Sequence, residues 1–298
     1  MKIKVVIFFG GPSREREISF AGGRTVFDNL NKALFEPIPI FVDSHRNFIL
    51  LDWQNIYKGS IRDFFPPVDF LPESPHGFQV YLESLSQLSD LEQEAVIEKV
   101  GKRIALEDLP QHISIAFLAL HGEYGEDGQI QQQLDDLKIP YTGSGVRPSQ
   151  IGMDKVLQKE LMAQRDFACP KILTFDREEW IGGNADDFYQ RAIDAVGFPI
   201  VVRPSNQGSS IGVSIIDEKG GLEAFEDAVN HAFFREVITV QRWQESSASE
   251  RVEEIRLLTD IRDGLGFPMD VHFKGEKTTF YHPEKLLAYL NEKAVNAD

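Results

Sequence analysis

A stretch near the middle of the chain, residues 198–214, combines features that suit the binding of an anion. Its sequence, FPIVVRPSNQGSSIGVS, predicts strand, loop and strand, because a β-branched apolar run is typical of a buried strand and Pro204 cannot donate to a sheet. The small side chains of residues 205–210 leave backbone N–H groups that can surround an anion, and Arg203 adds a positive charge. A serine-rich hairpin without a ligand is the alternative, and the segment alone does not separate the two.

Two further stretches place polar side chains directly after an apolar strand. GGPSREREIS (10–19) follows the apolar residues 2–9, and HGEYGEDG (121–128) follows HISIAFLAL (112–120). Open α/β sheets bind ligands at the carboxyl ends of their strands, so Glu15 and His121 are candidate ligand-binding residues.

Each candidate also has a purely structural interpretation. Glu15 and Glu17 suit the first turn of a helix, where the dipole favours acids, and His121 suits a hydrogen-bonded core position. Lys155, near the start of a helix predicted over 149–165, is either a phosphate-binding cation or a surface lysine.

The order of elements indicates an α/β protein. A strand over 2–9, a glycine turn and a helix over 14–34 begin a Rossmann-like open parallel sheet, with a helix over 129–137 capped by Asp127. From about residue 166 short strands and separate helices indicate a second, α+β domain. Further strands are predicted over 36–42, 112–120, 139–145, 170–175, 200–202, 211–214, 237–243, 252–261, 267–273 and 278–281. Further helices are predicted within 86–102, over 185–196, over 222–234 and over 283–293.

Composition excludes several classes of protein. Lys and Arg number 31 against 47 for Asp and Glu, which gives a net charge of −16 and disfavours a nucleic-acid partner. The single cysteine, Cys169, excludes an internal disulfide and a cysteine metal cluster, and favours a reducing compartment. The chain contains neither a secretory signal nor an apolar run of about 18 residues, so we expect a cytoplasmic protein without a membrane partner.

In this order, the motifs resemble those of the D-alanine–D-alanine ligases of the ATP-grasp superfamily. The matching stretches are residues 10–19, 120–131, 140–146, 153–155 and 201–214. The resemblance covers 1–43 and 112–245 well. It implies an N-terminal domain over 1–150 with an insertion at 44–110, a small ATP-grasp subdomain over 151–245, and the start of an incomplete large subdomain over 246–298.

The resemblance implies an ATP-dependent ligase. In this family ATP phosphorylates the carboxylate of one D-alanine, and the amine of a second D-alanine attacks the acyl phosphate to give the dipeptide for peptidoglycan. ATP and Mg²⁺ are the implied cofactors, D-alanine and ATP the partners, and a homodimer the implied assembly.

Matching positions imply roles for single residues. Glu15 corresponds to the anchor of the first D-alanine's ammonium group, His121 to a histidine lining that subsite, and Ser209 to the serine linking loop and substrate. Gly208 and Ser210 would offer backbone amides to phosphate, and residues 241–243 would form the adenine-binding strand. The expected nucleotide site comprises Lys155, Arg203, Gly208, Ser210, Gln241, Arg242, Trp243 and Glu254.

The sequence also departs from the family pattern. Arg203 stands where a second phosphate-binding lysine is usual, and Gln241 where a glutamate is expected. The lid sequence is poorly matched by residues 278–287, so D-lactate or D-serine stays open as second substrate.

No R-x-D followed by E-x-N occurs, so we expect no metal ligands in this chain and Mg²⁺ ligands in a missing C-terminal part. Two interpretations follow. One is a ligase whose chain is incomplete here, and the other is a catalytically inactive homologue that binds nucleotide or D-alanine or serves as an interaction module.

Overall fold

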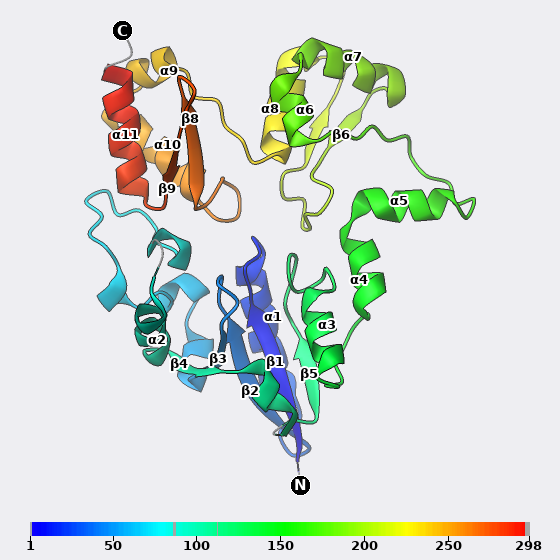
Figure 1. Cartoon of the computed structure of the whole chain (residues 1–298), viewed down its shortest axis with the longest axis vertical. Helices are drawn as coiled ribbons and strands as arrows, with labels where there is room; N and C mark the ends of the chain where they lie inside the picture. Colours follow the sequence, from blue (N-terminus) through cyan, green and yellow to red (C-terminus); the bar gives the residue numbers. More distant parts are fainter. Residues whose placement is uncertain (1, 86–87, 112, 296–298) are drawn as a thin grey trace. The chain divides into compact units, whose positions relative to one another are not determined.

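The computed structural model describes residues 2–85, 88–111 and 113–295, which divide into two compact units (Figure 1). The first unit contains the chain up to Gln150 together with residues from Thr239 onward, and the second contains Ile151–Ile238. Residues 239–298 therefore group with the N-terminal part, whereas the sequence had predicted a further subdomain starting at 246.

A mixed sheet with strand order β4-β3-β2-β1-β5 is the framework of the first unit. Its parallel part is β2-β1-β5, and β3 and β4 continue it in antiparallel fashion. The bounds are β1 (Ile3–Gly10), β2 (Phe35–Val42), β3 (Phe48–Leu51), β4 (Gly101–Ile104) and β5 (Ile115–Leu118). The predicted α/β fold with an open parallel sheet is confirmed.

The strand predicted over 112–120 is present but shorter. It corresponds to β5, and its first residue, His112, lies outside the described residues. The strand predicted over 139–145 is reduced to a single parallel bridge between Tyr141 and Ala116.

Helices cover both faces of the central strand, because β1 is apolar on both sides. Val5, Ile7 and Phe9 share a cluster with Phe20 of α1 (Arg16–Asn29). Val6 and Phe8, which point to the opposite face, share a cluster with residues of α3 (Gln129–Asp136). Gly128 occupies the N-cap position of α3, and Asp127 accepts a hydrogen bond from the backbone N–H of Gln129 (3.1 Å).

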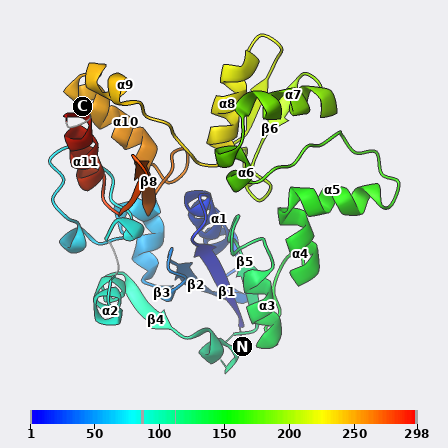
Figure 2. The ribbon, with the colours of Figure 1, turned by 45° about the horizontal axis from the view of Figure 1, so that its top comes forward.

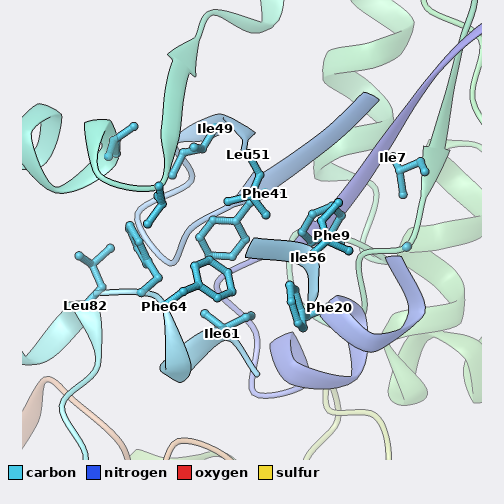
Figure 3. Packing of buried hydrophobic residues seen from close by; sticks show 14 of the residues in the cluster. Ile7, Phe9, Phe20, Phe41, Ile49, Leu51, Ile56, Ile61, Phe64 and Leu82 are labelled. Carbon is cyan, nitrogen blue, oxygen red and sulfur yellow. The ribbon is translucent and has the colours of Figure 1, made fainter. Parts of the chain in front are cut away.

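The segment 44–110, predicted to be an insertion, extends the sheet and completes one side of the core. Phe64 and Phe65 from this segment pack against Phe41 of β2, and Figure 3 shows Phe41 and Phe64 among the aliphatic side chains around them. Besides β3 and β4, the segment forms α2 (Asp90–Glu98) and the 3-10 helices η1 (Trp53–Tyr57), η2 (Ile61–Asp63), η3 (Val68–Phe70), η4 (Leu82–Leu85) and η5 (Leu106–Gln111).

Ser19 ties the carboxyl ends of β1 and β5 together. Its fully buried hydroxyl accepts a hydrogen bond from the Gly10 N–H (2.8 Å) and donates to the Ala119 carbonyl (2.8 Å). We expect Ser19→Ala to lower the free energy of unfolding by about 2 to 4 kcal/mol, because two buried main-chain groups lose their partner. Urea denaturation measures this. The control Thr25→Ala removes an exposed hydroxyl of the same helix, and equal losses in the two variants would contradict the expectation.

Residues 239–298 form helices around a hairpin, drawn as one orange and red group in Figures 1 and 2. The strands predicted over 237–243 and 252–261 are wrong, because both regions are helical. Helix caps override the β-branched composition there: Thr239 accepts from the Arg242 N–H, and Ser247 and Glu250 form a capping box. The elements are α9 (Val240–Glu245), α10 (Ala248–Thr259), β8 (Met269–Phe273), β9 (Glu276–Phe280) and α11 (Pro283–Val295), and the predictions of the last three are confirmed.

The second unit packs helices against the antiparallel pair β6 (Ile200–Val202) and β7 (Ser214–Ile216). The helix predicted over 149–165 is broken at Asp154, which caps the second half. The strand predicted over 170–175 is wrong: this segment has no regular structure, although Phe175 packs against Phe188 (ring centroids 4.8 Å apart). The helices are α4 (Val146–Met153), which crosses the boundary between units, α5 (Lys155–Ala163), α6 (Arg177–Gly182), α7 (Ala185–Ala195) and α8 (Gly221–Ala232).

None of the helices within the described ranges is both long and apolar enough to cross a membrane.

Candidate functional site

The loop after β1 and the loop after β5 are joined at the carboxyl edge of the sheet. The Ser13 hydroxyl donates to the carbonyl of His121 (2.7 Å) and accepts from the N–H of Glu15 (3.1 Å). Glu15 itself is 5% exposed at the start of α1. The structure therefore brings together Glu15 and the His121 segment, which the sequence places directly after two apolar strands. Ser13 lies within the quoted motif, but its linking role was missed.

Gly122 lets these two loops approach closely. Its φ is +67°, and a Cβ at this position would lie 2.9 Å from Glu15 Oε2 and 3.0 Å from Ser13 Cβ. The Glu15 carboxylate is thus packed against the backbone of Gly122. This arrangement requires glycine for two reasons, the left-handed conformation and the absence of a side chain.

The imidazole of His121 lies at the accessible rim of this site. Its side chain is 39% exposed, and Nδ1 lies 4.0 Å from Glu126 Oε2, which also accepts from the Gly122 N–H (2.7 Å). A buried carboxylate and a partly exposed imidazole suit the two charged ends of a small amino acid, since one favours an ammonium group and the other, when protonated, a carboxylate.

The serine loop in the second unit has a constrained backbone. β6 ends at Val202 and β7 starts only at Ser214, later than the predicted 211. Ser209 (φ 45°) and Ser210 (φ 61°) both adopt the left-handed conformation, which is uncommon for residues other than glycine. Both serines are exposed at the surface of the loop. Because unusual backbone of this kind concentrates at ligand-binding loops, it is consistent with the predicted anion-binding role.

Lys155 lies beside this loop. As the first residue of α5, it donates its backbone N–H to the carbonyl of Ser205 (3.0 Å), and its Nζ donates to Met153 (3.1 Å). Arg203, at the start of the loop, is exposed and reaches the carbonyl of Gln207 (3.4 Å). The second unit therefore gathers two cations next to the loop that carries Gly208 and Ser210, an arrangement that suits phosphate groups.

The predicted adenine-binding strand is absent, because residues 241–243 belong to helix α9. Trp243 is 2% exposed, and its Nε1 donates to Asn291 Oδ1 (3.1 Å), so its indole forms part of the core of the 239–298 segment. Arg242 pairs with Glu254 (2.8 Å), which lies on helix α10. The strands predicted for Gln241, Arg242, Trp243 and Glu254 are thus corrected to helices, and their nucleotide-binding role stays a prediction. The capping box at residues 247–250 is the sequence signal that could have revealed it.

The side chains of the described residues do not provide a site that fits Mg²⁺. Within residues 2–85, 88–111 and 113–295, no three His, Cys, Asp or Glu side chains are grouped so that they could hold a metal ion.

Comparison with known proteins gives consistent matches along the chain. Residues 4–144 match the family model described as D-ala D-ala ligase N-terminus, and residues 161–251 match the one described as D-ala D-ala ligase C-terminus. A D-alanine–D-alanine ligase of Geobacillus thermodenitrificans is 30% identical over 233 residues, covering 78% of this chain and 58% of the relative. A D-alanine–D-alanine ligase of Bacillus cytotoxicus is 31% identical over 239 residues, covering 80% of this chain and 60% of the relative.

A solved structure shows the same fold. The D-alanine-D-alanine ligase from Coxiella burnetii superposes with a TM-score of 0.53 at 21% identity, covering 78% of this chain and 60% of that protein. The chain spans about three fifths of the length of each of these three proteins. Because the two family models match in sequence order and the relatives agree with them, the chain belongs to the D-alanine–D-alanine ligase family.

Proposed function

We propose that this chain carries the D-alanine site and part of the nucleotide site of an enzyme that joins two D-alanines at the expense of ATP, for peptidoglycan precursors. The observation that carries the proposal is the packing of the buried Glu15 carboxylate against Gly122, next to His121, at the carboxyl edge of the parallel sheet. Family membership supplies the reaction class.

Glu15 would hold the ammonium group of the first D-alanine. A carboxylate shielded from water attracts an ammonium more strongly than an exposed one does, because the local dielectric constant is lower. His121 would face the carboxylate end, and Ser13 would keep the two loops at a fixed separation through its bonds to both. Binding both charged ends orients the carboxylate that is to be activated.

The loop of the second unit would hold the phosphates. ATP, when bound, supplies the phosphoryl group that turns a poorly electrophilic carboxylate into an acyl phosphate, which must then be protected from water. Lys155 and Arg203 would neutralise phosphate charge, and the backbone N–H groups of Gly208 and Ser210 would donate to phosphate oxygens. Ser209 is proposed to connect this loop with the substrate.

The same proposal covers the setting of the enzyme. An ATP-dependent step on free D-alanine places the protein in the cytoplasm, and the net charge of −16 disfavours nucleic acid. The family further implies a homodimer.

Binding measurements on the purified 298-residue chain test the proposal. We expect calorimetry to detect D-alanine binding. L-alanine is expected to bind at least about tenfold more weakly, because the methyl group and the hydrogen on its Cα are exchanged relative to D-alanine. Equal affinities for the two enantiomers would contradict the proposed D-alanine site. Binding of D-alanine and ATP without D-alanine-dependent phosphate release would show that the 298-residue chain is not itself an enzyme.

Lys155→Ala tests the nucleotide site separately. We expect ATP to bind about tenfold more weakly, because one charge-assisted contact to phosphate is lost, while D-alanine affinity stays unchanged. The matched control is Lys159→Ala, which removes a lysine one turn further along α5. If the two variants bind ATP alike, Lys155 is not part of the site.

A further inference from the structure

Arg16 braces the loop that precedes it. Its side chain is buried, and its guanidinium donates to the carbonyls of Ser13 (3.0 Å) and Pro12 (2.7 Å). These are the residues immediately before Arg14 and Glu15. The guanidinium thereby links the end of the 12–16 segment to its first two residues.

Glu83, from the insertion at 44–110, holds Arg16 in this position. Its Oε1 lies 2.7 Å from Arg16 Nη2, and the two side chains are only 13% and 7% exposed. Burial by itself raises the pKa of Glu83, but the charge and hydrogen bond of Arg16 bring that pKa below its ordinary value, so the pair is ionised. Removing one partner of a buried ion pair leaves an uncompensated charge, which makes this contact costly to break.

Arg14 fastens the same loop on the other side. Its Nη1 donates to the carbonyls of Ile261 (3.0 Å) and Gly264 (2.7 Å), and its Nη2 donates to Leu265 (2.9 Å). These acceptors lie in the turn after α10, outside both ranges that the family models match. The planar fork of arginine suits several acceptors at once, which a lysine does not.

Two helices of the 239–298 segment, α10 and α11, are bonded to residues 74–77. Arg256, one turn before the end of α10, donates to the carbonyls of His76 (3.1 Å) and Gly77 (3.2 Å). Glu284 of α11 accepts from the Ser74 hydroxyl (2.7 Å). The segment that leads to Glu83 and the segment that receives Arg14 are therefore bonded to each other as well as to the loop.

We propose that Arg14, Arg16 and Glu83 are positioning residues, which fix the loop 12–16 and thereby the Glu15 carboxylate between them. The insertion at 44–110 and the turn at 261–265 then set the affinity for the amino acid without touching it. This inference rests on the proposed D-alanine site.

The experiment compares Arg14→Met and Glu83→Gln with two controls that change the same charges at exposed positions, Arg262→Met and Glu73→Gln. Amide hydrogen exchange and D-alanine calorimetry are measured on the whole 298-residue chain. We expect exchange of residues 13–16 to accelerate about tenfold and D-alanine affinity to fall about five- to tenfold in both test variants, with exchange in β1 unchanged. For Arg14→Lys, the exchange of residues 13–16 and the D-alanine affinity are both expected to lie between those of the wild type and those of Arg14→Met.

Each outcome supports or contradicts the positioning role of Arg14, Arg16 and Glu83. Exchange and affinity equal to those of the controls would overturn the inference, and so would accelerated exchange that extends through β1, because that would show a general role in stability. Failure of the wild-type chain to bind D-alanine would refute the proposed function, while the exchange of residues 13–16 would still decide whether the loop is held as described. If Glu83→Gln does not fold, the two Arg14 variants decide.

Discussion

Replacing Gly122 with alanine is expected to reduce D-alanine affinity about 10- to 100-fold, because the Glu15 carboxylate must move and a hydrogen bond to a charged group contributes about 1.5 to 3 kcal/mol. The new Cβ would lie 2.9 Å from Glu15 Oε2, which must then shift, and 3.0 Å from Ser13 Cβ, which must give by a few tenths of an ångström. The φ of +67° adds a backbone strain of about 1 to 2 kcal/mol in an L-residue, so some stability is lost as well.

Gly143→Ala is a control that introduces the backbone strain of a positive φ without a close contact to a new Cβ. Gly143 also has a left-handed backbone (φ +102°), but a Cβ there would meet nothing within 4 Å. We expect a similar fall in thermal stability and no change in D-alanine affinity. Calorimetric titration of the two variants provides the measurement, and equal affinities for D-alanine would show that Gly122 does not shape the Glu15 site.

Phe41→Ala is expected to lower the free energy of unfolding of the first unit by about 3 to 5 kcal/mol, because a buried aromatic side chain is removed and a cavity is left. Phe41 is 2% exposed, and its ring centroid lies 5.2 Å from that of Phe65, 5.6 Å from Phe64 and 6.3 Å from Phe9 (Figure 3). It thus joins β1, β2 and the insertion at 44–110 in one cluster.

Phe167→Ala is the control for this change, because the Phe167 side chain is 60% exposed and its loss is expected to alter stability by less than about 0.5 kcal/mol. Urea denaturation followed by hydrogen exchange in each unit measures both. Equal destabilisation by the two substitutions, or an effect of Phe41→Ala confined to residues 151–238, would contradict the expectation.

The parallel sheet was predictable because its signals are local. The continuous apolar run of β1 and the glycines that follow it each act within a few residues, so they indicate a buried strand followed by a turn. The sequence also placed Glu15 and His121 at the same edge, since both follow strands that end there. It did not reveal that β3 and β4 extend the sheet, because neither strand shows regular alternation of apolar and polar residues.

The segment after residue 237 was misjudged for a physical reason. Apolar and β-branched side chains in VITVQRW favour a strand, but the hydroxyls of Thr239 and Ser247 satisfy backbone N–H groups at two helix starts. The partners of Arg14 were beyond prediction for a different reason. They are main-chain carbonyls, which every residue carries, so no side-chain pattern marks Ile261, Gly264 or Leu265 as acceptors.

The bonds of Arg14 also bear on how the protein is made. Its acceptors lie 247 to 251 residues further along the chain. At about 5 to 20 residues per second, a ribosome needs on the order of 10 to 50 s to deliver them after Arg14 itself has been synthesised. During that time the loop 12–16 is held by the Arg16–Glu83 contact but not by the hydrogen bonds of Arg14. The contacts that hold the loop 12–16 are therefore complete only after the whole second unit has been synthesised.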